Sequence, residues 1–194
     1  MANETQLSML ARVQETQFGA SWNDFSAMYD GMIQGWLFRQ GVQPQDADDI
    51  RQEVMTIVLR EIGRFEHNGR TGAFRAWLKA ITSNCLRDFW RKSKRRSPGG
   101  PDLAEVAAQL EDGSSSQSVL WDAEHDRHVI NYLLEQISTR LSEQSVTVFR
   151  RIVIDQEPAD KVAQDMGMKL GAARVAQHRV LNALKDVGSG LVEY

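Results

Sequence analysis

The sequence has little cysteine and no long apolar run. Cys85 is the only cysteine among 194 residues, so an intrachain disulfide is impossible and a cysteine-based zinc site is not expected. No stretch of about 18 apolar residues is present to span a bilayer. The N-terminal residues, MANETQLSMLARVQETQF, lack the charged start and apolar run of a signal peptide. These absences predict a soluble, cytoplasmic protein with no membrane partner.

Sustained alternation of apolar and polar residues, the pattern of a half-buried strand, is also missing. The apolar residues instead repeat at the three- and four-residue spacing of amphipathic helices, clearly from about residue 23 onward. An apolar content of 42% is ordinary for a globular chain, and 194 residues suffice for one domain or two small ones. We therefore predict an all-α fold.

The formal net charge of −3 argues against a uniformly basic DNA-binding protein, but the charges are segregated. Between Ser97 and Asp126 the sequence has seven acidic residues and no lysine or arginine. Between Lys169 and Lys185 it has four cations and no acidic residue. Basic patches therefore flank an acidic middle.

The stretch from Gly72 to Arg96 predicts the most informative helix. Its apolar face carries Phe74, Trp77, Leu78, Ile81, Cys85 and Phe89. Its other face, which we expect to meet solvent, carries Arg75, Lys79, Ser83, Leu86, Arg87 and Trp90. Five cations follow between Arg91 and Arg96. Cations that neutralise phosphates, beside an indole that can stack on an unpaired base, suit a nucleic acid. The alternative is a solvated basic helix end with a partly buried tryptophan.

Two segments rich in Gly, Pro and Ser are typical of a linker: SPGGP from Ser97 and EDGSSSQ from Glu111. They predict two small helical domains, residues 23–96 and 127–194, joined by a flexible acidic linker of residues 97–126. Between the breaker segments, residues 103–110 predict only a short amphipathic turn or two. Residues 1–22 form an N-terminal extension.

The C-terminal domain has the steric pattern of a helix-turn-helix. Ala163 is small enough for two helices to approach, Gly167 suits the turn, and Ala173 lies on the apolar face of the last helix. The outward side of that helix carries Lys169, Arg174, Gln177, His178 and Arg179, which can reach phosphates and base edges. A generic helical pair could have the same spacing.

Two metal sites are conceivable. Asp46, Asp49 and Glu53 share a helix face and could serve a metal-dependent enzyme, but a second acidic cluster on a facing helix is missing. His125 and His128 stand three residues apart, without a further ligand in the sequence. We expect no metal, no cofactor, no catalytic residues and no small-molecule substrate.

Three motifs stand out in the sequence: DADDIRQEVM (46–55), FEHNGRTGAFRAWLKAITSNCLRDFWRK (65–92) and EPADKVAQDMGMKLGAARVAQHRVLNALK (157–185). Together they resemble the sigma-70 family of bacterial RNA polymerase sigma factors, in its extracytoplasmic-function (ECF) subfamily. Their order matches the two conserved domains of that family, called regions 2 and 4.

The resemblance implies three sets of binding residues. The set expected to dock on the β′ clamp helices of core polymerase is Asp46, Asp48, Asp49, Gln52 and Glu53. The set expected to hold the melted −10 promoter element is His67, Asn68, Arg70, Lys79, Asn84, Arg87, Trp90, Arg91 and Lys92. The set expected to read the −35 element as duplex is Lys169, Arg174, Gln177, His178 and Arg179.

The same resemblance implies the β flap of the polymerase as a further partner, and it leaves open whether there is a cognate anti-sigma factor. It implies a linker that threads the basic channels of the polymerase, although a solvated spacer has the same composition. One residue departs from the family pattern: Lys169 stands where Ser or Thr commonly caps the recognition helix. The alternative function is a helix-turn-helix regulator that binds promoter DNA without replacing a sigma factor.

Overall fold

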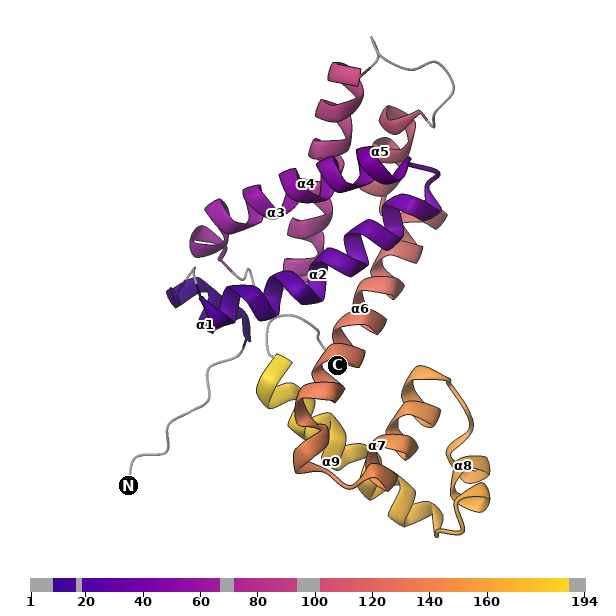
Figure 1. Cartoon of the computed structure of the whole chain (residues 1–194). Helices are drawn as coiled ribbons and strands as arrows, with labels where there is room; N and C mark the ends of the chain where they lie inside the picture. Colours follow the sequence, from indigo (N-terminus) through magenta and orange to yellow (C-terminus); the bar gives the residue numbers. More distant parts are fainter. Residues whose placement is uncertain (1–8, 17–18, 67–71, 94–101, 189–194) are drawn as a thin grey trace.

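The structure is a computed structural model that describes residues 9–16, 19–66, 72–93 and 102–188. Within these ranges every regular element is a helix, which confirms the all-α prediction. The elements are α1 (Met9–Thr16), α2 (Ala20–Arg39), α3 (Pro44–Glu61), η1 (Ile62–Arg64), α4 (Ala73–Ser93), α5 (Leu103–Glu111), α6 (Ser116–Ile137), η2 (Ser138–Arg140), α7 (Glu143–Phe149), η3 (Arg150–Ile154), α8 (Ala159–Asp165) and α9 (Leu170–Gly188). Figure 1 shows α1 to α5 in an upper body and α7 to α9 in a lower one, with α6 running through both.

Two glycines end helices by the same mechanism. Gly41 after α2 and Gly167 after α8 have positive φ angles of 78° and 63°, which a residue with a Cβ rarely adopts. This conformation lets the amide of Met168 donate to the carbonyl oxygen of Ala163 at 2.9 Å, and an equivalent bond of 3.1 Å closes α2. The turn predicted at Gly167 is therefore confirmed.

An aromatic cluster holds the upper body together. The ring centroids of Phe25 and Tyr29 in α2 lie 4.7 Å apart, and both side chains are fully buried. Phe74 of α4 packs edge-on against Phe25 at 5.9 Å. Trp77 extends the cluster towards Phe65 at 5.1 Å, so this half-buried indole contributes to packing as its apolar face predicts.

The described part of the predicted linker is not a flexible spacer. Its residues form α5 and the first half of α6, because Asp102 and Ser115 act as helix caps, although Ser115 lies in a segment interpreted as breaker-rich. The Asp102 carboxylate accepts from the amide of Ala104 at 2.9 Å, and the Ser115 hydroxyl accepts from the amide of Ser118 at 3.0 Å. The segment also contributes a fully buried Trp121 to the core. The expectation of a flexible connector is therefore wrong for residues 102–126.

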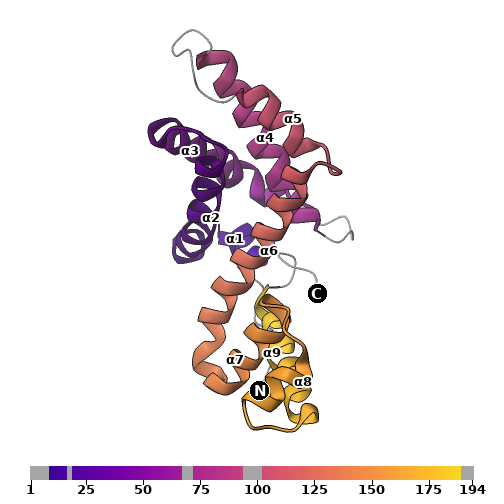
Figure 2. The same cartoon turned by 90° about the vertical axis from the view of Figure 1, so that its right-hand side faces the viewer.

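Helix α6 belongs to the cores of both bodies. Near its start, the Trp121 ring packs edge-on against Trp36 of α2, with centroids 4.9 Å apart. Near its end, Leu133 and Ile137 are buried in the same apolar cluster as Leu184 of α9. Figure 2 shows this helix as the continuous link between the upper and lower bodies.

A polar network lies beneath α6. The imidazole of His125 is fully buried, with Nε2 3.2 Å from the Tyr29 hydroxyl and Nδ1 3.0 Å from the Asp126 carboxylate. Arg75 of α4 donates to Asp126 at 2.5 Å and pairs with Asp122 at 3.3 Å. Burial lowers the pKa of His125 despite the nearby carboxylates. This histidine is thus a structural group of the interface between α6 and the upper body.

We predict that the free energy of unfolding falls as pH is lowered from about 7.5 to about 5. Because the pKa of His125 is lowered in the folded chain, the unfolded chain binds more protons below about pH 6.5. Stability is therefore full above that pH and is lost below it, by at most about 1.4 kcal/mol per pH unit for one proton. The measurement is urea unfolding as a function of pH.

The control for this titration is His125→Gln, which keeps a hydrogen-bonding side chain but cannot take up a proton. The groups that face His125 are Tyr29, Arg75, Asp122 and Asp126. The pKa of Tyr29 is raised and the pKa of Asp126 is lowered, so neither group titrates in this pH range. An identical pH slope in His125→Gln would contradict the assignment.

The lower body is a compact set of short helices around a small core. Val148 of α7, Val162 of α8 and Ala173 of α9 are buried against one another. Outside this core, the Arg151 guanidinium binds Glu157 at 2.6 Å and Asp165 at 2.6 Å, which ties the π-helical segment η3 to α8. Hydrogen bonds from Arg151 and Lys161 lower the pKa of Glu157 to about 2.

Candidate nucleic-acid interface

The acidic face of α3 consists of Asp46, Asp48, Asp49, Gln52 and Glu53. Pro44 opens the helix, and Asp46 in the first turn faces the positive end of the helix dipole. Asp49, Gln52 and Glu53 are exposed, whereas Asp46 and Asp48 are half-buried. The structure therefore brings the five predicted residues together on one helix.

These carboxylates differ in their partners. Asp48 binds Arg51 at 2.6 Å, and this hydrogen bond holds the pKa of Asp48 below its usual value. Arg51 also binds Asp30 of α2 at 2.6 Å, so Asp48 belongs to the α2–α3 contact. Asp49 and Glu53 form no ion pair with any other described residue. Like charges four residues apart on a helix repel, which leaves these two carboxylates suited to an external cation.

Helix α4 is packed on two sides, not one. Phe74 and Leu78 are buried towards α2 and α3, as predicted. Ser83 and Leu86 were expected on the solvent side, but both are fully buried because α5 packs against that side. What remains is a narrow exposed stripe of α4, made of Ala76, Ala80, Asn84, Asp88, Arg91 and Lys92.

The predicted −10 residues of α4 are only partly available. Asn84 is exposed, and its Oδ1 accepts from Nη1 of Arg87 at 3.1 Å. Arg91 and Lys92 are exposed, and Arg91 pairs with Asp88. The Lys79 side chain is 13% exposed and binds Asp122 at 2.7 Å, so it does not face solvent.

Five more residues belong to the predicted −10 set. Arg87 pairs with Glu111 of α5, and Trp90 is half-buried against the main core. The remaining three, His67, Asn68 and Arg70, lie outside the described residues.

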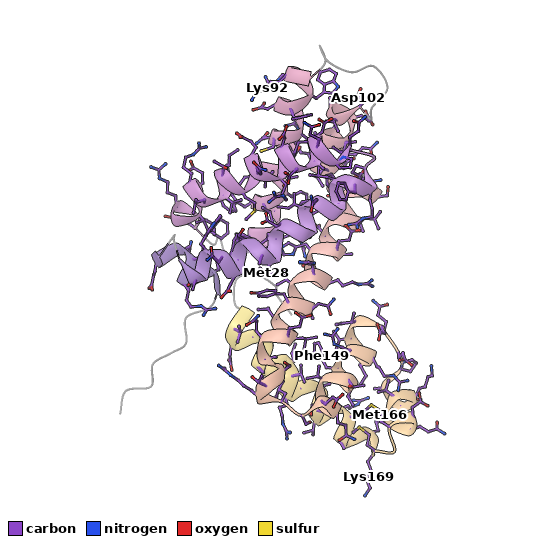
Figure 3. All side chains as sticks on the ribbon, viewed as in Figure 1. Met28, Lys92, Asp102, Phe149, Met166 and Lys169 are labelled. Atoms are coloured by element: carbon purple, nitrogen blue, oxygen red, sulfur yellow. The ribbon has the colours of Figure 1, made fainter. Side chains whose placement is uncertain are left out.

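Helix α9 presents the predicted −35 residues at the other end of the molecule. It begins at Leu170, and the Lys169 carbonyl accepts from the amide of Ala173 at 3.1 Å, so Lys169 precedes the first turn without a side-chain cap. Arg174, His178 and Arg179 are exposed, and Gln177 is half-buried. Figure 3 shows Lys92 and Lys169 at opposite ends of the molecule.

Sequence reasoning missed two exposed apolar side chains on α9. Leu170 is 41% exposed and Val175 is 59% exposed. Val175 stands between Arg174 and the next cationic turn at Arg179, where an apolar side chain can contact a thymine methyl group. The exposure of Val175 could have been predicted from its position in the sequence, because Val175 falls outside the helical series of buried residues that includes Ala173.

Other candidate chemistry is absent from the described ranges. There, no three His, Cys, Asp or Glu side chains gather closely enough to hold a metal ion. His128 donates to the backbone carbonyl of Met28, so it serves packing like His125. Burial raises the pKa of Cys85 to about 12, which keeps this thiol protonated and inert. Among the described helices, none has the length and apolarity to cross a membrane.

Comparison with known proteins accounts for this arrangement. Residues 27–96 match the model of sigma-70 region 2. The chain is 29% identical over 152 residues to the ECF RNA polymerase sigma factor SigD of Mycobacterium tuberculosis, covering 78% of this chain and 66% of SigD, which is just under two thirds of that relative.

Two further relatives have similar names. The identity is 30% over 143 residues to the ECF RNA polymerase sigma factor ShbA of Streptomyces griseus, covering 71% of this chain and 69% of ShbA. It is 25% over 167 residues to the RNA polymerase sigma factor CarQ of Myxococcus xanthus, covering 86% and 88%. These relatives are named as sigma factors, not as enzymes. The chain belongs to the sigma-70 family of RNA polymerase sigma factors, in its extracytoplasmic-function subfamily.

Proposed function

We propose that the chain binds core RNA polymerase through the acidic face of α3, holds a melted −10 element on α4 and reads a −35 duplex with α9. The observation that carries the proposal is the region 2 match over residues 27–96, because that range contains both the acidic face and α4. The whole assembly would direct the polymerase to promoters and start transcription.

The exposed stripe of α4 supports a role in single-strand binding. Taking a base out of the DNA stack costs a few kcal/mol, so the protein must compensate with contacts made only to the opened strand. The Asn84 amide has a donor and an acceptor that can pair with a base edge. Arg91 and Lys92, about two turns further along, can neutralise adjacent phosphates.

The experiment that tests the proposal is transcription by core polymerase with and without this chain. The expected result is that specific transcripts appear only when the chain is added, and sequencing their 5′ ends gives the promoter. A stand-alone regulator would bind promoter DNA without binding core polymerase. Promoter-specific transcription that needs another sigma factor would therefore favour the regulator.

We predict that Arg174→Ala and Arg179→Ala each weaken binding to duplex promoter DNA. Both side chains are exposed on α9 and are ion-paired with no other described residue, so both charges are available. A phosphate contact would be lost equally for all sequences, with a shallower salt dependence. A contact to a guanine edge would instead relax specificity at one position by roughly 1–3 kcal/mol.

Electrophoretic mobility shifts at several salt concentrations measure this effect. Lys185→Ala is the matched control, because it removes an exposed cation from the last turns of the same helix. Promoter binding that tolerates both arginine changes would mean that another face of the domain contacts the −35 element.

A further inference from the structure

Helix α5 packs against one side of α4. On this side the cations of α4 were expected to face DNA. Leu103, Ala107 and Leu110 are its buried residues, and together they exclude water from that side of α4. Figure 3 labels Lys92 near the end of α4 and Asp102 at the start of α5, at the same end of the molecule, so the two helices run antiparallel.

Polar contacts from α5 reach the residues beside the exposed stripe. Ser83 donates to the Ala107 carbonyl at 3.0 Å and to the Glu111 carboxylate at 2.9 Å. Glu111 also pairs with Arg87, whose guanidinium donates to Asn84. One carboxylate of α5 thus binds the cation that touches the candidate base-reading amide.

Other cations of α4 form ion pairs with carboxylates of α6. Lys79 binds Asp122 at 2.7 Å, and Arg75 binds Asp126 at 2.5 Å. Arg75, Lys79 and Arg87 share one side of α4, so each of these three cations has a carboxylate where a DNA phosphate would otherwise bind. The acidic segment therefore satisfies the charges that nucleic acid would satisfy.

Helices α5 and α6 are not equally difficult to displace. The α6 contact includes the fully buried Trp121 and His125, so opening it would disrupt the core. Helix α5 spans only 9 residues, and such short helices are marginal without tertiary packing. Its Glu111–Arg87 pair is partly exposed, with side-chain exposures of 41% and 38%. Leu103, Ala107 and Leu110 of α5 belong to the same core as Trp121 but are smaller side chains, so opening α5 exposes less buried surface than opening α6.

We propose that α5 is an acidic cover over the strand-binding side of α4, and that Glu111 competes with single-stranded DNA for Arg87. The proposal rests on the function proposed above for α4 and adds its regulation. In the free chain the cover lowers affinity for single-stranded DNA. When α5 leaves α4, Arg87 becomes available to phosphates and its hold on the Asn84 amide ends.

The test compares Glu111→Gln with Glu105→Gln in the full chain. Both variants remove one negative charge from α5, but among the described residues the Glu105 carboxylate accepts a hydrogen bond only from Gln109 of its own helix. The probe is a fluorescent single-stranded DNA oligonucleotide of mixed sequence, because a phosphate contact does not depend on sequence. We expect Glu111→Gln to bind about two- to fivefold more tightly than wild type, the range set by a partly exposed ion pair. Glu105→Gln should match wild type.

A second variant, Leu110→Ala, weakens the apolar contact of α5 without changing charge. It should also tighten DNA binding, with faster hydrogen exchange in α5 and unchanged exchange in α3. Equal DNA affinity in Glu111→Gln and Glu105→Gln would overturn the proposal. So would faster exchange of α5 in Leu110→Ala with no gain in DNA affinity. Because neither assay contains polymerase, both outcomes are independent of the transcription experiment.

Discussion

Replacing Asp49 and Glu53 together with lysine is expected to weaken binding to core polymerase by about 100-fold or more. Close charge pairs at interfaces have coupling energies of about 1.5–7 kcal/mol, and this double change turns two attractions into repulsions. Both carboxylates are exposed and ion-paired with no other described residue, so the free protein should remain folded. The measurement is binding of labelled protein to core polymerase by fluorescence anisotropy.

The matched control reverses two exposed carboxylates elsewhere, Glu135→Lys with Asp186→Lys, so that the net charge changes equally. Asp48 is unsuitable for either role, because its bond to Arg51 and the bond of Arg51 to Asp30 support the α2–α3 packing. Unchanged affinity in the Asp49/Glu53 variant would remove the docking role from α3. Equal losses in both double variants would indicate a general charge effect.

The sequence predicted the helices well because their apolar residues recur at helical spacing and glycine ends two of them. The apolar repeat that is clear from about residue 23 lies in α2, and the end of this helix at Gly41 depends on a positive φ that glycine supplies. The prediction of a flexible linker was wrong for a physical reason. Asp102 and Ser115 belong to residue types that favour both turns and helix N-caps, and only the packing of the following residues decides between these roles.

The candidate site was predicted unevenly for a related reason. Exposure of Asp49 and Glu53 followed from their positions opposite the apolar stripe of their helix. Lys79 and Leu86 were placed on the solvent side because one apolar stripe was assumed to mean one buried face. A helix packed on both sides has a mixed second face, where a lysine can be half-buried if a carboxylate such as Asp122 meets it.

Continuity of α6 changes how the two halves of the molecule should communicate. A flexible connector would let each half respond independently, whereas α6 contributes buried residues to both. Even so, a change at an exposed residue of α4 that contacts neither α6 nor the lower body should stay local. Asn84 is such a residue, since its described hydrogen bond is to Arg87.

Asn84→Ala is accordingly expected to lower open-complex formation on duplex promoter and to relax base preference at one −10 position. A good side-chain contact to a base edge contributes roughly 1–3 kcal/mol of discrimination between bases. Alanine lacks both the donor and the acceptor of the Asn84 amide. Affinity for the −35 duplex should not change. Arg91→Ala should instead weaken single-strand binding for every sequence, because the Arg91 side chain is 71% exposed and suited to a phosphate.

Permanganate footprinting on duplex and pre-melted bubble templates separates these effects. Asn84→Ala should be defective mainly where the promoter must be opened, since a bubble removes most of the cost of extruding a base. The Arg91→Ala defect should appear on both templates and fade as salt screens the phosphate contact. Asp88→Ala is the matched control, because it leaves Arg91 charged and releases it from its ion pair. If Asn84→Ala behaves like wild type on both templates, Asn84 does not read the extruded base.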